Sequence, residues 1–273
     1  MESVGKLQEL KKKLAEKDQI LIAFSGGVDS SLLAKVATDV LGDGALCVIL
    51  DSEAMPRSDL ENAKSLAKSL GISLRIVKFS ILDIPRFLEN SPDRCYICKK
   101  ESSKMLMDMA AQAGIDCVAD GVNLSDCSDF RPGILASNEE GIWHPFVEVG
   151  ITKEDVREIA RKMGLAFWSK PSSACLSSRM PYGEQITKES LARVEEAEDY
   201  LKRLGLGQVR LRAHGKMARI EVLAQDMGKV LGSREQIVRK LKEIGYLYVA
   251  LDLEGFRSGS MNELLQERSN ESR

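Results

Sequence analysis

The chain has 273 residues, 44% hydrophobic and 29% charged, which is long enough for one large core or two modest ones and typical of a globular protein. Its 39 basic and 41 acidic residues give a net charge of −2, which excludes a global positive field for nucleic acid or an anionic membrane but not a local basic groove. Residues 1–18 lack the apolar region of a signal peptide or membrane span, so we expect a cytoplasmic protein. Six cysteines in such a chain indicate thiols, metal ligands or catalytic groups rather than a disulfide framework.

Short apolar runs alternate with amphipathic helical patterns over the first two thirds of the chain. We expect buried parallel strands at residues 20–24, 45–51, 73–79 and 116–120, with helices at residues 31–41, 58–70 and 99–113. This alternation predicts an α/β fold with a doubly wound parallel sheet.

The pattern changes near residue 183. A helix is expected at residues 186–204, paired strands at 208–214 and 217–223, a helix at 233–244 and a strand at 246–253. We therefore predict two domains, residues 1–183 and a smaller α+β domain at residues 184–273.

The stretch AFSGGVDSSL begins at the end of the first expected strand. Backbone N–H groups of its Gly26-Gly27 turn and of the next helix would form an anion cradle, to which Ser25 and Ser30 add hydroxyl donors. Asp29 would repel a phosphate unless Mg²⁺ lay between them, so it favours a magnesium nucleotide. No lysine follows the glycines, which excludes a kinase-type γ-phosphate loop. The alternative is a polar turn before a core helix.

The loop resembles S-G-G-x-D-S, the PP-loop of ATP pyrophosphatases, which hold pyrophosphate and leave AMP on the substrate. From residue 20 to 259 the sequence also resembles the LarE family, ATP-dependent sulfurtransferases that mature the nickel-pincer cofactor of lactate racemase. The shared stretches are AFSGGVDSSL, DGVNLSD with DFRPG close behind, SSRMPYG, VRLRAHGKMARIEV and YVALDLEGFRSGSMNE.

The resemblance implies a reaction that uses ATP and Mg²⁺. A carboxylate of pyridinium-3,5-biscarboxylic acid mononucleotide is adenylated, and sulfur then displaces AMP to give a thiocarboxylate. Adenylation is needed because a carboxylate repels nucleophiles and lacks a good leaving group. Residues 1–183 would then form the PP-loop ATP-binding domain, and residues 184–273 the substrate-binding and oligomerisation domain, in a homo-oligomer for which the family implies a hexamer.

Cys95 and Cys98 in DRCYICKK have the C-x-x-C spacing of a metal hairpin, and Cys175 lies in the loop before the second domain. Some LarE members carry one cysteine that gives up its sulfur and becomes dehydroalanine, while others carry three that bind a [4Fe-4S] cluster. This chain has the three-cysteine pattern, and the sacrificial cysteine corresponds to Ala174. The resemblance thus implies a cluster with one iron free to bind added sulfide. A zinc site that includes a histidine and an unmetallated set of thiols are the alternatives.

Arg210 and Arg212 alternate on one face of an expected strand, an arrangement that suits bidentate capture of a phosphate. Spacing alone favours a solvated strand face, but the family's substrate-phosphate arginines match these two positions.

Ser178, Arg179 and Glu198 match a polar cluster near the family's active site. A further acidic position of that cluster is Lys229 in this chain. The residues without an assigned role are Asp126, Cys127, Asp129 and Arg131.

Two other functions stay open. A tRNA thiolase would share the PP-loop and the cluster, but it should carry a basic surface or an added RNA-binding module. An AMP-binding sensor without catalysis would need neither the reactive cysteines nor Asp29. The sulfur donor, sulfide or another source, does not follow from the sequence.

Overall fold

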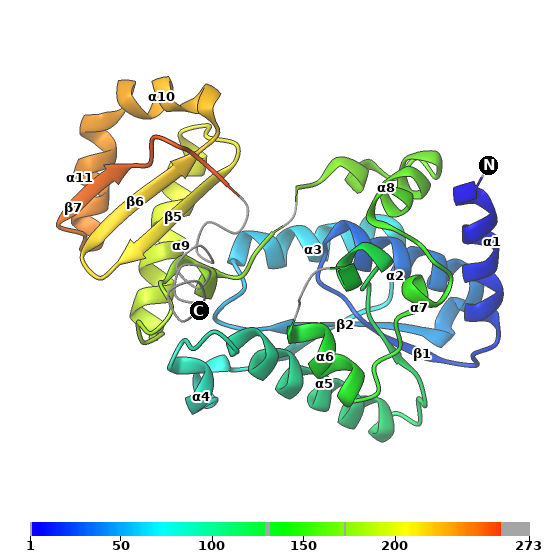
Figure 1. Ribbon diagram of the computed structural model, residues 1–273. Coiled ribbons are helices and arrows are strands. Elements are labelled where there is room, and N and C mark those ends of the chain that lie inside the picture. Colours follow the sequence, from blue (N-terminus) through cyan, green and yellow to red (C-terminus); the bar gives the residue numbers. More distant parts are fainter. Residues whose placement is uncertain (1, 129–131, 172, 258–273) are drawn as a thin grey trace, which may run out of the picture. The chain divides into compact units, whose positions relative to one another are not determined.

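The computed structural model describes residues 2–128, 132–171 and 173–257. The chain divides into two compact units (Figure 1). The first comprises Met1–Ile81 and Asp93–Ser173, and the second comprises Leu82–Pro92 and Ala174–Arg273. Within the described ranges, no helix is both long and apolar enough to cross a membrane.

The first unit is built on a parallel sheet of four strands in the order β3-β2-β1-β4. The strands are β1 (Ile20–Ala23), β2 (Ala45–Asp51), β3 (Leu74–Lys78) and β4 (Val118–Ala119). The predicted doubly wound parallel sheet is therefore confirmed. The strand β4 is shorter than expected at both ends, since only Val118 and Ala119 pair with β1, and the backbone N–H of Asp120 donates to the carbonyl of Trp143 instead.

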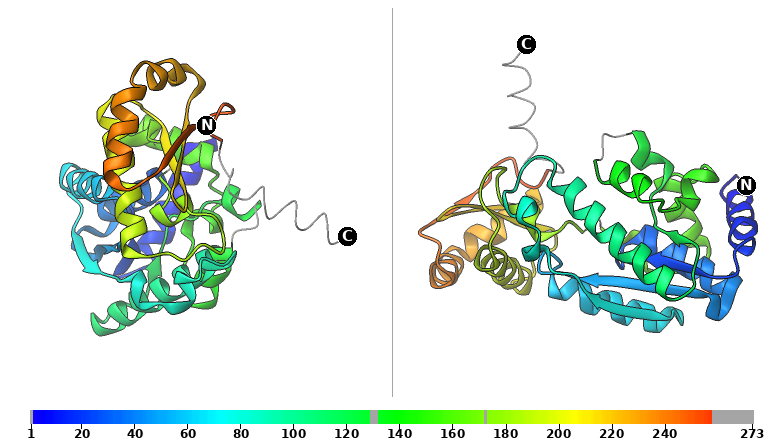
Figure 2. Two further views of the ribbon diagram at one scale, coloured as in Figure 1. Left: turned by 90° about the vertical axis from the view of Figure 1, so that its left-hand side faces the viewer. Right: turned by 90° about the horizontal axis from the view of Figure 1, so that it is seen from below.

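Helices cover both faces of this sheet (Figure 2). They are α1 (Glu2–Ala15), α2 (Val28–Leu41), α3 (Arg57–Leu70), α5 (Arg94–Gln112), α6 (Pro132–Glu139), α7 (Pro145–Glu148) and α8 (Lys153–Lys162). Short 3-10 turns occur at η1 (Gly42–Gly44), η2 (Ile81–Asp83), η3 (Leu124–Ser128) and η4 (Ala166–Ser169). Ile20 and Ile22 of β1 pack in the core under α1, α2 and α8, whereas Leu21 packs with Leu106 of α5. Side chains of a strand alternate between faces, so both faces are buried.

The helix α5 begins five residues earlier than predicted. Pro92 stands before the N-cap Asp93, where its missing N–H costs no helical hydrogen bond, and no glycine or proline follows it until the helix has ended. Cys95 and Cys98 therefore lie on a helix rather than in a hairpin.

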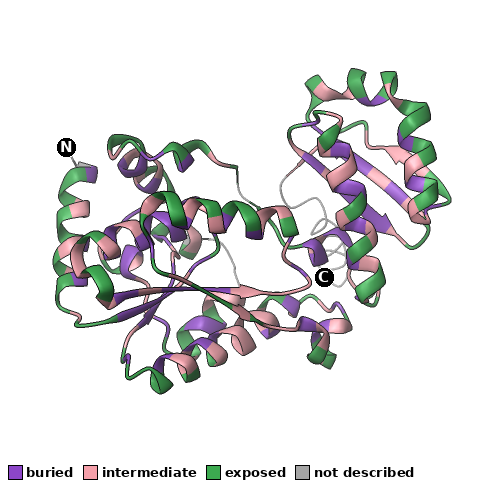
Figure 3. Cartoon of the chain, turned by 180° about the vertical axis from the view of Figure 1, so that it is seen from behind, coloured by how far each residue is buried: buried purple, intermediate pink, exposed green. Residues whose placement is uncertain are grey.

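The second unit contains a three-stranded sheet in the order β5-β6-β7, with β5 (Val209–His214) antiparallel to β6 (Met217–Val222) and β7 (Tyr248–Leu251) parallel to β6. Its helices are α4 (Pro85–Leu88), α9 (Lys188–Arg203), α10 (Met227–Gly232) and α11 (Arg234–Ile244), with 3-10 turns η5 (Leu176–Arg179) and η6 (Ala224–Asp226). Apolar residues alternate with charged ones along β5 and β6, and both strands are largely buried (Figure 3). The expected small α+β unit is present.

The segment 82–92 packs with the chain that follows Cys175. Asn90 is buried, and its Nδ2 donates hydrogen bonds to the carbonyl oxygens of Pro181 (2.7 Å) and Glu184 (3.0 Å). The backbone N–H of Ile186 donates to the carbonyl of Leu88 at 2.8 Å. The second compact unit therefore includes the segment 82–92 and begins again at Ala174, whereas the sequence predicted a single boundary at residue 183.

Candidate functional site

The PP-loop connects β1 to α2 and is closed by its own hydroxyl groups. Ser30 Oγ accepts a hydrogen bond from the backbone N–H of Ser25 at 3.2 Å and lies 3.0 Å from Ser25 Oγ. The N–H of Gly27 donates to Ser25 Oγ at 3.3 Å. Gly27 is the N-cap of α2 and supplies no side-chain acceptor, so the first N–H groups of the helix stay available to an anion.

Two glycines permit close packing around this loop. Gly26 has a φ of +69°, and a Cβ there would lie 2.6 Å from Ala63 Cβ of α3. A Cβ on Gly121, just after β4, would lie 2.7 Å from the backbone nitrogen of Ser30. The loop is thus held between α3 and the end of β4, where the strand order reverses and α/β sheets bind ligands.

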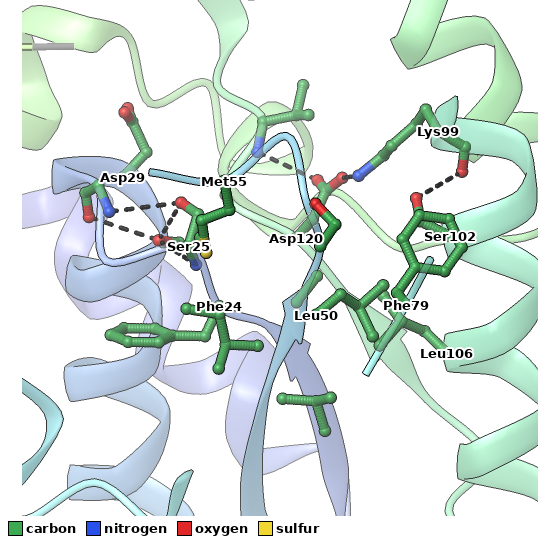
Figure 4. A pocket seen from close by; sticks show the side chains of 18 of the residues that line it. Phe24, Ser25, Asp29, Leu50, Met55, Phe79, Lys99, Ser102, Leu106 and Asp120 are labelled. Carbon is green, nitrogen blue, oxygen red and sulfur yellow. Dashed lines mark hydrogen bonds and ion pairs between the residues drawn. The ribbon is translucent and has the colours of Figure 1, made fainter. Parts of the chain in front are cut away.

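A cavity of about 410 Å³ opens beside the loop (Figure 4). Its polar side includes Ser25, Gly27 and Ser30. Its apolar wall is formed by Phe24, Val48, Leu50, Met55, Phe79 and Leu106. A cavity with an anion cradle on one side and an apolar wall on the other suits a nucleotide, whose base is apolar and whose phosphates are charged.

Two carboxylates stand at the loop end of this cavity. Asn123 connects them, since its Nδ2 donates to Asp29 Oδ1 at 2.9 Å and its backbone N–H donates to Asp126 Oδ2 at 3.2 Å. Burial, together with the negative charge of Asp126, raises the pKa of Asp29. Asn123 is buried, and among the described residues its Oδ1 has no hydrogen-bond partner. Crowded oxygen ligands beside a phosphate cradle fit a hard cation such as Mg²⁺.

A second hollow of about 160 Å³ lies against the same loop. It is lined by Lys153, Arg157 and Lys170 together with Ser25 and Gly27. Lys170 Nζ donates to the carbonyl of Gly26 at 2.9 Å. The positive charge that the loop sequence lacks is therefore supplied by residues more than a hundred positions away, which sequence reasoning missed.

Cys95 and Cys98 are three residues apart in the first turns of α5, so they lie on one side of the helix. Cys95 is exposed, and Cys98 is half-buried and lines the nucleotide-sized cavity. In the described part of the chain neither of them is in a disulfide, and neither is the exposed Cys175 of the second unit. Within neither unit, as far as it is described, do three Cys, His, Asp or Glu side chains form a group that could hold a metal.

The turn that carries Cys175 is held by buried charges. Arg179 Nη1 donates to the carbonyl oxygens of Ala174 and Cys175, each at 2.9 Å. Ser178 Oγ donates to the same Cys175 carbonyl at 2.8 Å. Arg179 and Glu198 are only 1% exposed and form a two-point ion pair, with Nε–Oε1 at 2.8 Å and Nη2–Oε2 at 3.0 Å. The structure thus brings the predicted cluster together around Cys175, with Arg179 and Glu198 fixing the turn from inside.

The two predicted phosphate-binding arginines differ in their surroundings. Arg212 is buried and pairs with the buried Glu221 at 2.8 Å, while its Nη1 donates to the carbonyl of Ser178 at 3.0 Å. Arg210 is half-buried and its guanidinium lies over the ring of Phe256, 5.5 Å from the centroid. Both lie on the face of β5 opposite its buried Leu211.

The remaining expectations concern positions outside these clusters. Lys229 donates from Nζ to the carbonyl of Gly205 at 2.9 Å. Cys127 is exposed. Asp129 and Arg131 lie outside the described residues.

A parallel sheet with the SGGVDS cradle at the end of its first strand, beside a nucleotide-sized cavity, defines an ATP-binding protein of the PP-loop class. The family model described as NAD synthase matches residues 4–112. The chain is 44% identical to an uncharacterized protein of Synechocystis sp. over 96% of this chain and 98% of that one. It is 40% identical to the pyridinium-3,5-bisthiocarboxylic acid mononucleotide synthase of Lactiplantibacillus plantarum over 92% of each chain.

A tRNA-specific 2-thiouridylase of Clostridioides difficile is more distant, at 28% identity over 65% of this chain and 60% of that one. The chain belongs to the LarE family, the family of the pyridinium-3,5-bisthiocarboxylic acid mononucleotide synthase. The predicted resemblance is confirmed.

Proposed function

We propose that this protein is an ATP-dependent, AMP-forming sulfurtransferase that acts on pyridinium-3,5-biscarboxylic acid mononucleotide in nickel-pincer cofactor biosynthesis. The observation that carries the proposal is the single cavity that joins the SGGVDS cradle, the Asp29–Asp126 pair and an apolar wall. The likeness over nearly the whole chain to a synthase of the corresponding bisthiocarboxylic acid supports it.

The nucleotide would lie with its base on the apolar wall and its terminal phosphates in the cradle. Asp29 and Asp126 would hold Mg²⁺, which when bound offsets their repulsion of the phosphates. Lys153, Arg157 and Lys170 of the smaller hollow would receive the departing pyrophosphate.

The first step is adenylation. A substrate carboxylate oxygen attacks the α-phosphorus of ATP, the bond from that phosphorus to the bridging oxygen breaks, and its electron pair leaves with pyrophosphate. The carboxyl group has then lost the negative charge of its oxygens, and its carbon is open to a nucleophile. A sulfur nucleophile attacks that carbon, and the C–O bond breaks with its electron pair leaving on AMP, so a thiocarboxylate remains.

Cys95, Cys98 and Cys175 are the residues that would hold a [4Fe-4S] cluster. Their chemistry fits, because in the described part of the chain none of the three is in a disulfide, and thiolates are the ligands of such clusters. When bound with three protein ligands, such a cluster offers one iron to an added sulfide.

Arg210 and Arg212 would bind the phosphate of the substrate mononucleotide. A phosphate that approached Arg212 would meet a guanidinium already oriented by Glu221. Oriented donors lose less freedom on binding, so the pair favours recognition of a phosphate.

The protein would act as a homo-oligomer, for which the family implies a hexamer. Large apolar side chains of the second unit are exposed, among them Leu231, Leu247, Tyr248 and Leu253. An assembly that covered these side chains would remove their apolar surface from water.

The test is turnover under anaerobic conditions with ATP, Mg²⁺, the pyridinium dicarboxylate and sulfide. We expect AMP and pyrophosphate, a thiocarboxylate product, and several turnovers with Cys175 intact by peptide mass. ADP as the main product would refute adenylation. A single turnover with dehydroalanine at residue 175 would show a consumed cysteine instead.

The cysteines can also be tested without turnover. Replacement of Cys95, Cys98 or Cys175 by serine should each remove iron and visible absorbance from anaerobically purified protein, because a hydroxyl replaces a thiolate poorly as a ligand. ATP binding should remain. Cys127→Ser is the matched control, since that thiol is exposed and outside the set.

A further inference from the structure

A buried carboxylate stands at the end of β4, next to the PP-loop. Asp120 accepts hydrogen bonds from His144 Nδ1 at 2.7 Å, from Lys99 Nζ at 2.8 Å and from the backbone N–H of Val122 at 3.1 Å. Burial alone would raise the pKa of Asp120, but the charge of Lys99 and the hydrogen bond from His144 outweigh burial and hold that pKa well below its usual range. Asp120 therefore stays ionised and keeps both neighbours in place.

Lys99 brings a positive charge into the nucleotide-sized cavity. It lies on α5 directly after Cys98, lines the cavity, and points toward Asp120 (Figure 4). The other charged residues of the described lining are the carboxylates Asp29, Asp120 and Asp126. An ammonium has three N–H donors, and Asp120 accepts one of them, so two remain for a ligand.

His144 is itself fixed on its far side. Its Nε2 lies 3.4 Å from Ser137 Oγ, which donates to the carbonyl of Ile134 at 2.9 Å. The imidazole side chain is 10% exposed and both ring nitrogens have partners. The three side chains thus form a continuous relay from His144 through Asp120 to the Lys99 ammonium in the cavity.

We propose that Lys99 is a catalytic residue that contacts the α-phosphate of ATP during adenylation, and that Asp120 and His144 are positioning residues that hold its ammonium. The proposal rests on the proposed function. With the base on the apolar wall and the terminal phosphates in the cradle, the α-phosphate lies between them, in the cavity that Lys99 lines.

The reaction needs a cation at that point. As the carboxylate oxygen adds to the α-phosphorus and the bond to pyrophosphate breaks, two anions are forced together, and the phosphoryl oxygens carry the charge. A donor already held in place by Asp120 stabilises that charge without having to reorganise. The effect should therefore appear in kcat more than in ATP binding.

The test compares Lys99→Met and Lys99→Arg with Lys104→Met, a control on the same helix whose lysine forms an exposed pair with Glu101. The measurements are pyrophosphate release with ATP and the pyridinium dicarboxylate, and calorimetric binding of α,β-methylene ATP. Lys99→Met should lower kcat about 100-fold or more, as the loss of one transition-state donor does. Its affinity for the analogue should fall much less, and Lys99→Arg should recover part of kcat. The control should match the wild-type protein.

The relay is tested by two variants of His144. The amide nitrogen of asparagine takes the place of Nδ1, so His144→Asn should retain most of kcat, whereas His144→Phe should lose a large part of it. Equal kcat in these two variants would refute the relay. The two His144 variants test the relay even if Lys99→Met does not fold.

The role of Lys99 is refuted if Lys99→Met turns over like the wild-type protein, or if its loss of analogue binding equals its loss of kcat. Wild-type protein that forms no AMP and pyrophosphate would instead refute the proposed function. The two failures are therefore distinguishable.

Discussion

The buried ion pair below Cys175 makes a strong prediction about Glu198→Gln. Glu198 accepts three hydrogen bonds, from Arg179 Nε, Arg179 Nη2 and the backbone N–H of Leu211. Glutamine has the same shape but no charge, and its NH₂ group must face a donor of Arg179. The guanidinium is then a buried charge without a counterion.

Removing one partner of a buried pair is expected to destabilise the fold by about 3–5 kcal/mol. Glu196→Gln is the matched control, two residues before Glu198 on α9, because Glu196 forms a half-exposed pair with Lys240. An exposed pair contributes at most about 1 kcal/mol. Arg179→Met combined with Glu198→Leu should recover stability, since an apolar pair of similar volume leaves no buried charge.

The assay must report on the second unit. Both tryptophans, Trp143 and Trp168, lie in the first unit, so their fluorescence follows that unit alone. Hydrogen exchange in α9 and β5 should accelerate in Glu198→Gln while the tryptophan transition in urea stays unchanged. Alkylation of Cys175, followed by peptide mass, should accelerate as well. If hydrogen exchange in α9 and β5 is no faster in Glu198→Gln than in Glu196→Gln, the Arg179–Glu198 pair does not support the turn that carries Cys175.

Three further predictions concern the other sites. Gly26→Ala should abolish binding of α,β-methylene ATP, because its Cβ would lie 2.6 Å from Ala63 Cβ, whereas Gly42→Ala, with φ of +55° but no atom within 4 Å, should retain it by calorimetry. Asp29→Asn should lose Mg²⁺-dependent ATP binding yet melt at a higher temperature than the wild-type protein at pH 7 without ligand. Because the pKa of Asp29 is raised in the folded protein, ionisation of this carboxyl group destabilises the wild-type fold as pH rises. The melting temperatures of Asp29→Asn and the wild-type protein should therefore converge below about pH 4, where Asp29 is protonated in both the folded and the unfolded state. Melting temperatures that stay apart at that pH would contradict this prediction. Arg212→Ala should weaken binding of the substrate mononucleotide by roughly 1.5–3 kcal/mol and leave the ATP analogue unaffected, and equal losses would contradict its assignment.

The sheet and the PP-loop were predictable because their signals are local. A buried strand, two glycines and a helical apolar pattern predict the backbone between Ile20 and Leu41 without reference to the rest of the chain. The second sheet was predictable for the same reason, since apolar and charged side chains alternate along β5 and β6. The division into units could not be predicted in this way. The segment 82–92 joins the second unit through hydrogen bonds of Asn90 and Leu88 to residues that follow about ninety positions later in the chain.

Which polar residues lie beside the PP-loop depends on the order of the strands in the sheet, and that order cannot be read from the sequence. Gly121 lies beside Ser30, and Asp120 lines the same cavity, only because β4 pairs with β1 at the point where the order reverses. Lys99 and Lys170 come from α5 and from the chain after α8, and their positions depend on how those helices pack.

One rule could nevertheless have found part of this site. In a parallel sheet all carboxyl ends meet at one edge, so polar residues directly after any strand are candidates to face the loop after β1. Applied to the expected strand at residues 116–120, the rule selects Asp120 and the DGVNLSD stretch that contains Asn123 and Asp126. The structure places all three around Asp29 and Lys99. It follows that the stretch shared with the LarE family after β4 serves the same nucleotide cavity as the PP-loop, and that variants of Asp120 should be compared with variants of Asp29 in one ATP assay.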